Sequence, residues 1–542
     1  MSNARNSTAP ELSLRTRAAN LERMRRERFD VVVIGGGATG AGVALDAAAR
    51  GLTVALVEQR DFASGTSSRS SKLIHGGLRY LERFELGLVR EGLRERARLR
   101  KNAPHLSAPL PFLVPVYKTG ERSPLGNRVL KLRAGLTLYD GLAGRQNFAR
   151  HRWLPPAEAL TFAPHLSAEG LRGAFLYYDG LTDDARLVIE IIKTAAAHGA
   201  VVANYVAATG FVERDGYIAG VEISDRLSGE RLTAAARIVI NATGVWADQV
   251  IRMSDAAAPK SLRPSKGIHA VLPAEKLSNR AAVLIPSLGE QRFLFVIPWQ
   301  NRTVIGTTDT DYVGHPEEPR ATAAEVRRVV ESAARSFPDA GITMRDVIST
   351  FAGLRPLAAG GASATKELSR RETIIETQAG MISIIGGKLT TWRAMAERAV
   401  DLALKRLAAH APARLTSTHS RTAEIELAGS ALLTGDLGAE AARLADEYAV
   451  PRQTAEHLLQ SYGGNGVAVL ELTRRREVLK RRLIADLPHI EAETVYAARR
   501  EMTVTVEDFL ARRTRIRLLA RDGGASCVAR VTQLLAEENQ VV

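Results

Sequence analysis

The sequence contains a single cysteine, few aromatic residues and no long uninterrupted apolar run. Because Cys527 is the only cysteine among 542 residues, an internal disulfide framework is excluded and a cytosolic location is expected. No histidine pair stands beside carboxylates at the spacing of metal ligands, so we predict no structural metal. Glycines, Asp30 and Asp46 interrupt the most apolar stretch, residues 29–52, which argues against a membrane-spanning helix. Residues 1–28 lack the apolar segment of a signal peptide and predict a flexible basic arm.

Positive charge is in excess. Lysine and arginine number 74 and aspartate and glutamate number 59, so the formal net charge is +15. Such a chain favours anionic partners, namely nucleic acid, an anionic membrane surface or anionic metabolites. Aromatic residues make up only 5% of the chain and no helix-turn-helix or zinc-finger pattern is present, so no nucleic-acid partner is expected.

A glycine motif follows the first apolar segment. The run Val31–Ile34 has the β-branched composition of a buried parallel strand, and residues 41–50 have the small residues of a closely packed helix. Between them, G-x-G-x-x-G is formed by Gly35, Gly37 and Gly40. In this context the glycines permit a tight turn, the approach of a pyrophosphate and close helix–strand packing. The N-terminus of the helix then favours the phosphates.

An acidic residue completes the predicted dinucleotide site. A second strand, residues 54–57, ends at Glu58, whose carboxylate can accept hydrogen bonds from ribose hydroxyls and would repel the 2′-phosphate of NADP. NAD and FAD both remain compatible with this motif. Residues 237–248 and 382–400 each show a strand that runs into glycine, and a second glycine-led helix start could hold the carbonyl end of a flavin, which favours FAD.

The rest of the chain divides into a β-rich middle and a helical end. Residues 210–224 and 292–308 alternate β-rich runs with polar turns and predict antiparallel hairpins. Beyond residue 415 the sequence is rich in Ala, Leu, Arg and Glu, which indicates a separate helical domain.

Seven segments together resemble the FAD-dependent, quinone-linked glycerol-3-phosphate dehydrogenases. In chain order they are VVIGGGATGAGVALDAAARGL, TSSRSSKLIHGGLRYLE, DDARLV, NATGVWAD, IGTTDTDY, GLRPL and GGKLTTWR. The resemblance spans most of residues 29–400, and the helical tail is similar to the C-terminal domain of that family. It implies an α/β fold with a Rossmann-like FAD-binding domain of the D-amino-acid-oxidase type, a β-rich substrate domain and an all-α C-terminal domain.

The expected division of the chain follows from this resemblance and from the composition. A flexible basic arm comes first and a helical domain last, and the two domains between them are discontinuous. The expected boundaries are 1–28 for the arm, 29–105, 180–250 and 350–405 for the FAD-binding domain, 106–179 and 251–349 for the substrate- and membrane-facing domain, and 415–542 for the helical domain.

The resemblance also implies an activity and its residues. The activity is oxidation of sn-glycerol 3-phosphate to dihydroxyacetone phosphate, with hydride passing from C2 to FAD and electrons then to a membrane quinone. The implied substrate-binding residues are Arg79, Tyr80, Arg355, Arg370 and Lys388. The implied cofactor-binding residues are Gly35, Gly37, Gly40, Glu58, Ser67, Ser71, His75, Gly76, Gly77, Val206, Ala242, Thr243, Gly244, Trp246, Gly353, Gly387, Lys388, Leu389 and Thr390. In this interpretation the bare backbone of Gly76–Gly77 passes close to the flavin.

Three residues are expected to be catalytic, namely His269, Arg355 and Lys388. His269 is the first candidate for the base that removes the hydroxyl proton, because the family has a histidine at this place; its alternative role is only to orient the substrate. Asp248 and Asp309 are further candidates. Arg355 could instead form a structural ion pair, and Arg370 lies beside Arg371, so either of the two could point into the site.

A leucine-rich helical stripe flanked by basic residues suggests attachment to an anionic membrane surface. Its apolar members are Leu125, Val129, Leu132, Leu136 and Tyr139, and its basic members are Arg128, Lys131 and Arg133. Such a stripe could equally face a protein core. With the basic arm, it predicts a cytoplasmic enzyme held peripherally on the inner face of the cell membrane, and a homodimer is possible.

Two other functions fit the sequence. An oxidase would use the same substrate and flavin but pass electrons to oxygen and form hydrogen peroxide. More remotely, the chain could be a basic nucleotide-binding protein without catalysis.

Overall fold

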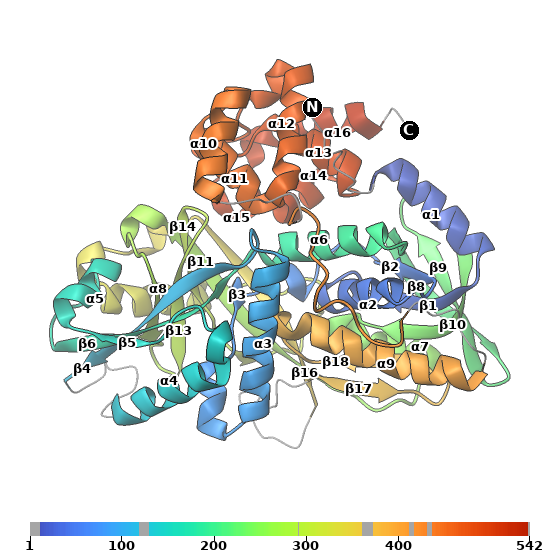
Figure 1. Cartoon of the computed structure of the whole chain (residues 1–542), viewed down its shortest axis with the longest axis horizontal. Coiled ribbons are helices and arrows are strands. Elements are labelled where there is room, and N and C mark those ends of the chain that lie inside the picture. The colour runs from blue at the N-terminus through green and yellow to red at the C-terminus, as the bar shows by residue number, and fades with distance from the viewer. Residues whose placement is uncertain are drawn as a thin grey trace.

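The first sheet begins with a strand that leads into a glycine turn and a helix, as the sequence predicts. The computed structural model describes residues 11–118, 129–290, 292–359, 372–410, 417–430 and 436–539. In these ranges the chain forms two sheets that lie side by side, with a helical domain above them in the view of Figure 1. The predicted fold class is confirmed.

The first sheet has eight strands. They are β1 (Phe29–Ile34), β2 (Val54–Val57), β7 (Val201–Ala203), β8 (Val206–Arg214), β9 (Tyr217–Asp225), β10 (Arg231–Asn241), β17 (Thr373–Glu376) and β18 (Ile382–Ile385). The central strands β18, β10, β1, β2 and β7 are parallel, while β17 is antiparallel at one edge. Strands β8 and β9 form the predicted hairpin, which pairs with β10.

Strand β1 is buried on both faces, which explains its uninterrupted β-branched composition. Val31 and Val33 pack into the core on one face, and Val32 and Ile34 into the core on the other. The first core contains residues of α2 (Ala38–Ala49), α6 (Asp184–Ala197) and α9 (Trp392–His410). The second core contains residues of α1 (Leu14–Arg26), α7 (Ala247–Ser254) and the β8–β9 hairpin.

The second sheet has ten strands. They are β3 (Leu73–Ile74), β4 (Ala108–Tyr117), β5 (Arg152–Leu154), β6 (Leu171–Leu181), β11 (Leu262–Pro273), β12 (Ala282–Pro286), β13 (Phe293–Trp299), β14 (Arg302–Gly306), β15 (Thr310–Asp311) and β16 (Ser349–Ala358). The predicted hairpin in residues 292–308 is β13–β14. Helices α3 (Leu86–Asn102) and α4 (Val129–Ala143) belong to one core of this sheet, and α5 (Pro156–Phe162) and α8 (Ala323–Ser336) to the other.

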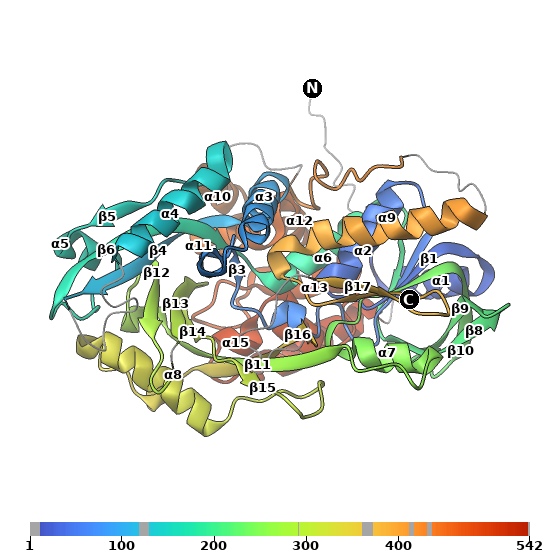
Figure 2. The ribbon, with the colours of Figure 1, turned by 90° about the horizontal axis from the view of Figure 1, so that it is seen from below.

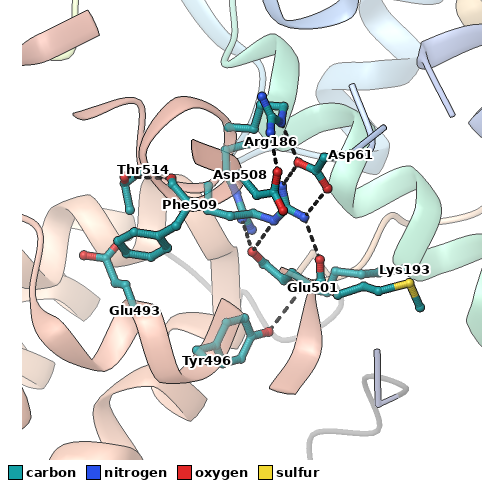
Figure 3. A network of polar contacts seen from close by, with 12 residues as sticks. Asp61, Arg186, Lys193, Glu493, Tyr496, Glu501, Asp508, Phe509 and Thr514 are labelled. Atoms are coloured by element: carbon teal, nitrogen blue, oxygen red, sulfur yellow. Dashed lines mark hydrogen bonds and ion pairs between the residues drawn. The ribbon is translucent and has the colours of Figure 1, made fainter. Parts of the chain in front are cut away.

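The end of the chain is helical, as the sequence predicts. Its helices are α10 (Leu437–Tyr448), α11 (Arg452–Tyr462), α12 (Gly466–Arg475), α13 (Glu491–Arg500), α14 (Val506–Asp508), α15 (Ile516–Leu519) and α16 (Val528–Asn539). Buried ion pairs attach this domain to the first sheet's side of the molecule: Arg186 on α6 binds Glu501 (2.7 Å), and Arg513 binds Asp61 (2.7 Å). Figure 3 shows Asp61, Arg186, Glu501 and Asp508 pointing toward one another.

The structure contradicts the prediction of a flexible arm for residues 14–26. They form α1, whose N-terminus is capped by Ser13 through a capping box. Arg17 is buried and makes an ion pair with Asp225 on β9. The basic composition alone could not reveal this partner, which lies about 200 residues away in the sequence.

The interpretation of the leucine stripe as a membrane face was also wrong. On α4, Leu136 and Tyr139 are buried in a protein core, and Val129 and Leu132 pack against that core. Leu125 and Arg128 lie outside the described residues. The stripe therefore satisfies the alternative interpretation, in which the apolar side of the helix covers a sheet.

Two segments that were assigned to the FAD-binding domain contribute strands to the second sheet. Residues 350–405 were assigned to the FAD-binding domain, but β16 is an antiparallel partner of β11 in the second sheet, with Ser265 opposite Arg355 and His269 opposite Phe351. Likewise, β3 lies in the second sheet, paired with β6. Strand pairing between such distant segments is invisible to local patterns.

Candidate active site

A cavity of about 320 Å³ is lined by residues of both sheets. Its walls include the turn after β1, the loop after β2, and parts of β11, β16 and the segment that follows β18. In the view of Figure 2, β16 and β11 lie between the two halves of the molecule. The site is thus formed from segments at both ends of the first 400 residues.

The glycine motif packs as the sequence predicts. Gly35 has a φ of +110°, and a Cβ on it would lie 2.7 Å from the carbonyl oxygen of Ala242. A Cβ on Gly40 would overlap the carbonyl oxygen of Gly35, so this glycine permits close helix–strand packing. Gly37, in contrast, lines the cavity, and the nearest atom to a Cβ placed there is Ser67 Oγ at 3.1 Å.

The start of α2 is arranged for an anion. The backbone N–H of Ala38 donates to Ser67 Oγ (3.0 Å), and both residues line the cavity. The Ser67 hydroxyl can in turn donate a hydrogen bond to a phosphate oxygen at the positive end of the helix. The sequence indicated Ser67 through the TSSRSSK segment, which is one of the segments that carry the resemblance.

Glu58 is half-buried at the end of β2. Its carboxylate accepts hydrogen bonds from the N–H groups of Gly36 (2.7 Å) and Arg60 (2.9 Å). Burial raises the pKa of Glu58 above its usual value, although these two hydrogen bonds oppose the rise. The backbone bonds hold the carboxylate at the cavity wall, where it can accept hydrogen bonds from ribose hydroxyls.

The cavity wall offers a further donor for a flavin dinucleotide. Trp246 lines the cavity, and its indole Nε1 is buried with no hydrogen-bond partner among the described residues. A buried donor of this kind is unfavourable unless a ligand or water accepts from it. Together with the bare backbone at Gly37 and the start of α2, it shows that the wall fits the dinucleotide predicted from the sequence.

His269 lies on β11 and is buried at the cavity wall. Its Nε2 is 2.9 Å from Ser71 Oγ, and its ring stacks on Phe351 with a centroid separation of 4.5 Å. Burial, followed by the charges of Lys72 and Arg355, holds the pKa of His269 well below its usual value. The imidazole is therefore neutral at physiological pH and able to accept a proton.

Arg355 lies on β16 and is held by the turn after β14. Its guanidinium donates to Thr307 Oγ1 (2.8 Å) and to the carbonyl oxygen of Thr308 (3.1 Å), and it lies 3.4 Å from Asp309. Asp309 also pairs with Arg292 at 2.9 Å. The guanidinium of Arg355 thus forms the ion pair of the alternative interpretation and also lines the cavity, and its role toward the substrate stays a prediction.

Lys388 follows the glycine pair after β18, and its ammonium lies over the ring of Tyr80, 3.9 Å from the centroid. Arg79 is exposed, and its guanidinium lies 5.5 Å from the same ring. Tyr80 and Lys388 line the cavity. The structure therefore brings together the two motifs that contain these residues, and a hydrogen bond from His75 N to Thr390 Oγ1 (3.1 Å) connects them.

Most of the predicted site residues lie together. Those that line the cavity are Gly35, Gly37, Glu58, Ser67, Ser71, His75, Tyr80, Val206, Ala242, Thr243, Gly244, Trp246, His269, Gly353, Arg355, Gly387, Lys388, Leu389 and Thr390. Gly40, Gly76, Gly77 and Arg79 are not in its wall, and Arg370 lies outside the described residues. Of the two alternative bases, Asp309 binds Ser265 and the arginines, and Asp248 accepts hydrogen bonds from the N–H groups of Ser261 and Leu262.

The structure gives the Gly76–Gly77 pair a packing role. A Cβ on Gly76 would lie 2.6 Å from the Tyr139 hydroxyl and 2.7 Å from the Leu93 side chain. Gly77 has a φ of +85°, and a Cβ there would overlap the ring of Tyr80. The pair turns the chain tightly so that Tyr80 folds back toward Lys388, and this requirement accounts for the missing side chains.

Arg69 and Thr307 are among the cavity-lining residues that the sequence did not predict. Arg69 lines the cavity, and burial, with Arg512 nearby, lowers its pKa. Thr307 lines it as well and accepts from Arg355. Both lie inside segments that carry the resemblance, TSSRSSK and IGTTDTDY, so position within those segments was the available signal.

A group of three metal-ligating side chains lies in the helical domain. The ligand atoms of His457, His489 and Glu493 are within 4.8 Å of one another, a grouping that sequence spacing did not suggest. Both oxygens of Glu493 already accept hydrogen bonds, from His457 Nε2 (2.9 Å), the Tyr462 hydroxyl (3.0 Å) and Ile490 N (2.8 Å). The absence of a structural metal stays a prediction.

Comparison with known proteins supports the resemblance. Residues 30–393 match the family model described as FAD dependent oxidoreductase, and residues 420–541 match the C-terminal domain of alpha-glycerophosphate oxidase. The chain is 38% identical to glycerol-3-phosphate dehydrogenase of Mycobacterium leprae over 97% of its own length and 88% of the relative. It is 36% identical to aerobic glycerol-3-phosphate dehydrogenase of Staphylococcus aureus over 91% and 87%.

A solved structure extends the similarity to the fold. The glycerol-3-phosphate dehydrogenase of Bacillus halodurans, solved in complex with FAD, superposes with a TM-score of 0.78 at 32% sequence identity. The superposition covers 98% of this chain and 95% of that one. Both the two-sheet part and the helical domain are therefore shared.

Proposed function

Because the chain belongs to the FAD-dependent glycerol-3-phosphate dehydrogenases, we propose that it oxidises sn-glycerol 3-phosphate at C2 to dihydroxyacetone phosphate. FAD is its cofactor. The observation that supports this substrate most directly is the meeting of Arg355, Lys388, Tyr80 and His269 at one cavity whose other wall carries the dinucleotide motif.

The cavity residues divide between cofactor and substrate. The turn of Gly35 and Gly37, the Ser67 hydroxyl and the start of α2 would hold the pyrophosphate of FAD, and Glu58 its ribose. The substrate's phosphate is a dianion, which suits Arg355 as a planar two-pronged donor and Lys388 as a point charge. When bound, FAD supplies the acceptor for the hydride that leaves C2.

His269 is the residue proposed to receive the hydroxyl proton. It is neutral and fixed in orientation by Ser71 and Phe351. Arrival of a phosphate dianion beside Arg355 and Lys388 would offset positive charge around the imidazole and so raise its pKa toward the working pH. The proton would therefore be accepted most readily when the substrate is in place.

For the electron acceptor we propose a membrane quinone, with the protein held peripherally at the cytoplasmic membrane surface. In the described part of the chain no helix is both long and apolar enough to cross a bilayer. However, Phe84 and Leu130 are 85% and 80% exposed, and α4 contacts the segment 78–83 that precedes Phe84. We call Phe84, Leu86, Leu130 and Leu138 the apolar patch, and exposed Arg83, Arg90, Lys131 and Arg133 lie beside them in the sequence.

An oxidase remains the second candidate function. The observation that favours it is the match of residues 420–541 to the C-terminal domain of alpha-glycerophosphate oxidase. The two activities differ in a measurable way, because an oxidase consumes oxygen and forms hydrogen peroxide without quinone. A homodimer stays a prediction.

The proposed reaction is tested by anaerobic titration. Glycerol 3-phosphate should bleach the flavin absorbance of the purified protein in the absence of oxygen and quinone, and a spectrum unchanged by the substrate would refute the function. Adding a soluble quinone should then restore the colour, while restoration only by oxygen would identify an oxidase.

The phosphate-binding role is tested by comparing two substrates. A charge-assisted hydrogen bond contributes about 1.5–3 kcal/mol, so Arg355→Ala or Lys388→Ala should lower kcat/KM for glycerol 3-phosphate by roughly 10- to 100-fold. The loss should be much smaller for glycerol, which has no phosphate. Arg320→Ala, which removes an exposed arginine that pairs with exposed Glu318, is the matched control. Equal losses on both substrates would instead indicate a role in positioning the flavin.

A further inference from the structure

Three charged side chains lie buried behind His269 and have no part in the mechanism above. Lys72 belongs to the segment that contains Ser71, Asp184 begins α6, and Arg515 comes from the helical domain. All three side chains are 2% exposed or less. Buried charges are costly unless they are paired, so their arrangement requires an explanation.

The carboxylate of Asp184 is the centre of this group. Lys72 Nζ lies 2.7 and 2.8 Å from its two oxygens, and a nitrogen of Arg515 lies 2.8 Å from Oδ1. Both cations also donate to the carbonyl oxygen of Ser68, each at 2.8 Å. Asp183 provides a second negative charge, 3.6 Å from Arg515, so two cations face two carboxylates.

The same carboxylate holds the loop that contacts His269. Asp184 Oδ2 accepts from the backbone N–H of Ser70 (2.9 Å) and from its hydroxyl (2.7 Å). The next residue, Ser71, places its hydroxyl 2.9 Å from His269 Nε2. The donors in residues 68–72 that bind Asp184 therefore help to hold the Ser71 hydroxyl, which is the hydrogen-bond partner of the His269 imidazole.

Phe351 provides a second connection. Its ring stacks on His269 at 4.5 Å with an interplanar angle of 9°. Lys72 Nζ lies 5.0 Å from the centroid of the same ring. Displacement of Lys72 would thus alter both the hydroxyl and the aromatic ring that hold His269.

We propose that Lys72, Asp184 and Arg515 are positioning residues for His269, through which the helical domain contributes to the chemistry at the flavin cavity. This inference rests on the proposed function, because it assumes that His269 takes the substrate's proton. It assigns a task to the buried lysine of SSKLIHGG and to the acidic pair of DDARLV, which the mechanism otherwise leaves unused.

The charge of Lys72 has a second consequence. The charged groups that act on His269 are Lys72, Arg355 and Asp184, and Arg515 acts through Asp184. Lys72 disfavours protonation of the imidazole and so keeps it ready to accept a proton. The pKa of Lys72 is itself lowered to about 8 by burial and by Arg515, so the lysine remains mostly charged at neutral pH.

The test is the pH profile of kcat/KM for glycerol 3-phosphate in the full-length holoenzyme. Activity should fall at acid pH as His269 becomes protonated. Lys72→Met should move this acidic limb to higher pH by about 1 unit, since a nearby like charge is removed, and Lys72→Arg should restore its position. FAD content, read from the ratio of flavin to protein absorbance, is measured for each variant.

A second variant covers the case in which Lys72→Met does not fold. Arg515→Gln should lower kcat at least 10-fold while KM for glycerol 3-phosphate and FAD content stay near their wild-type values. The control is Arg517→Gln, two residues after Arg515 in the sequence, which breaks an exposed ion pair with Glu507. It should leave kcat, KM and FAD content unchanged. An unmoved acidic limb in folded Lys72→Met, or an unchanged kcat in Arg515→Gln, would overturn the inference. A wild-type protein that does not oxidise glycerol 3-phosphate would refute the proposed function instead.

Discussion

Replacement of Asp61 by asparagine should loosen the attachment of the helical domain. Asp61 is fully buried and accepts hydrogen bonds from Arg513 at 2.7 and 2.8 Å, from Arg512, and from Asn204 Nδ2 at 3.2 Å. It is the anion shared by two neighbouring buried arginines (Figure 3 shows its position). An Asp61→Asn change keeps the shape of the side chain and removes only the charge.

The expected loss of stability depends on the partners that Arg512 and Arg513 retain in Asp61→Asn. Removing one partner of a buried ion pair costs about 3–5 kcal/mol, because the remaining charge stays buried without compensation. Arg512 retains Asp508 at 2.6 Å, and Arg513 retains the carbonyl oxygen of Glu501 at 2.7 Å. We therefore expect a loss of about 3 kcal/mol in the free energy of unfolding, at the lower end of that range.

The assay is urea unfolding followed by far-ultraviolet circular dichroism and by release of FAD fluorescence. Unfolding of the helical domain should begin at lower urea in Asp61→Asn than in the wild type. The control is Glu507→Gln, which breaks the exposed pair with Arg517 and should cost about 0.5 kcal/mol or less. Similar changes in both variants would show that the buried charge of Asp61 contributes no more than a surface charge, which would refute the reasoning.

Three further results are expected. Arg513 and Arg512 outweigh the effect of burial and lower the pKa of Asp61 from 3.8 to about 2. The stability that depends on this shift is present above about pH 4 and is lost as the pH falls toward 2, so about 2 kcal/mol of the expected difference of about 3 kcal/mol between wild type and Asp61→Asn should disappear there. Gly37→Val should yield a folded protein without flavin absorbance, because the side chain would enter the wall proposed to hold the pyrophosphate, and a fully yellow variant would contradict this. Leu130→Asp should weaken sedimentation with vesicles containing anionic lipid, whereas Val313→Asp, at a residue 97% exposed outside the apolar patch, should not; equal binding by both would exclude the patch as the attachment surface.

The local parts of the dinucleotide site were predictable from the sequence alone. The buried strand, the tight turn at Gly35, the close packing at Gly40 and the acid at Glu58 all occur within 30 consecutive residues. Their geometry depends on backbone conformation and on periodicity, which short-range patterns record. The helical end was predictable for the same reason, since its helices have compositions and spacings of their own.

The surfaces that these elements contact depend on the folded chain and could not be predicted from local patterns. An apolar stripe on α4 is equally suited to a bilayer and to a protein core, and the presence of a sheet beside it determined the outcome. The Gly76–Gly77 pair likewise packs closely against Tyr139, Leu93 and Tyr80, which its sequence did not indicate, and its approach to the flavin stays a prediction.

Local patterns likewise could not reveal the pairing of the buried charges next to His269. Lys72, Asp184 and Arg515 are separated by 112 and 331 residues, and no local pattern relates them. Their pairing results from the way in which the helical domain packs on the loop after β2 and on α6. A buried charge is stable only beside its partner, so the side chains that tune His269 become visible only when the whole chain is folded.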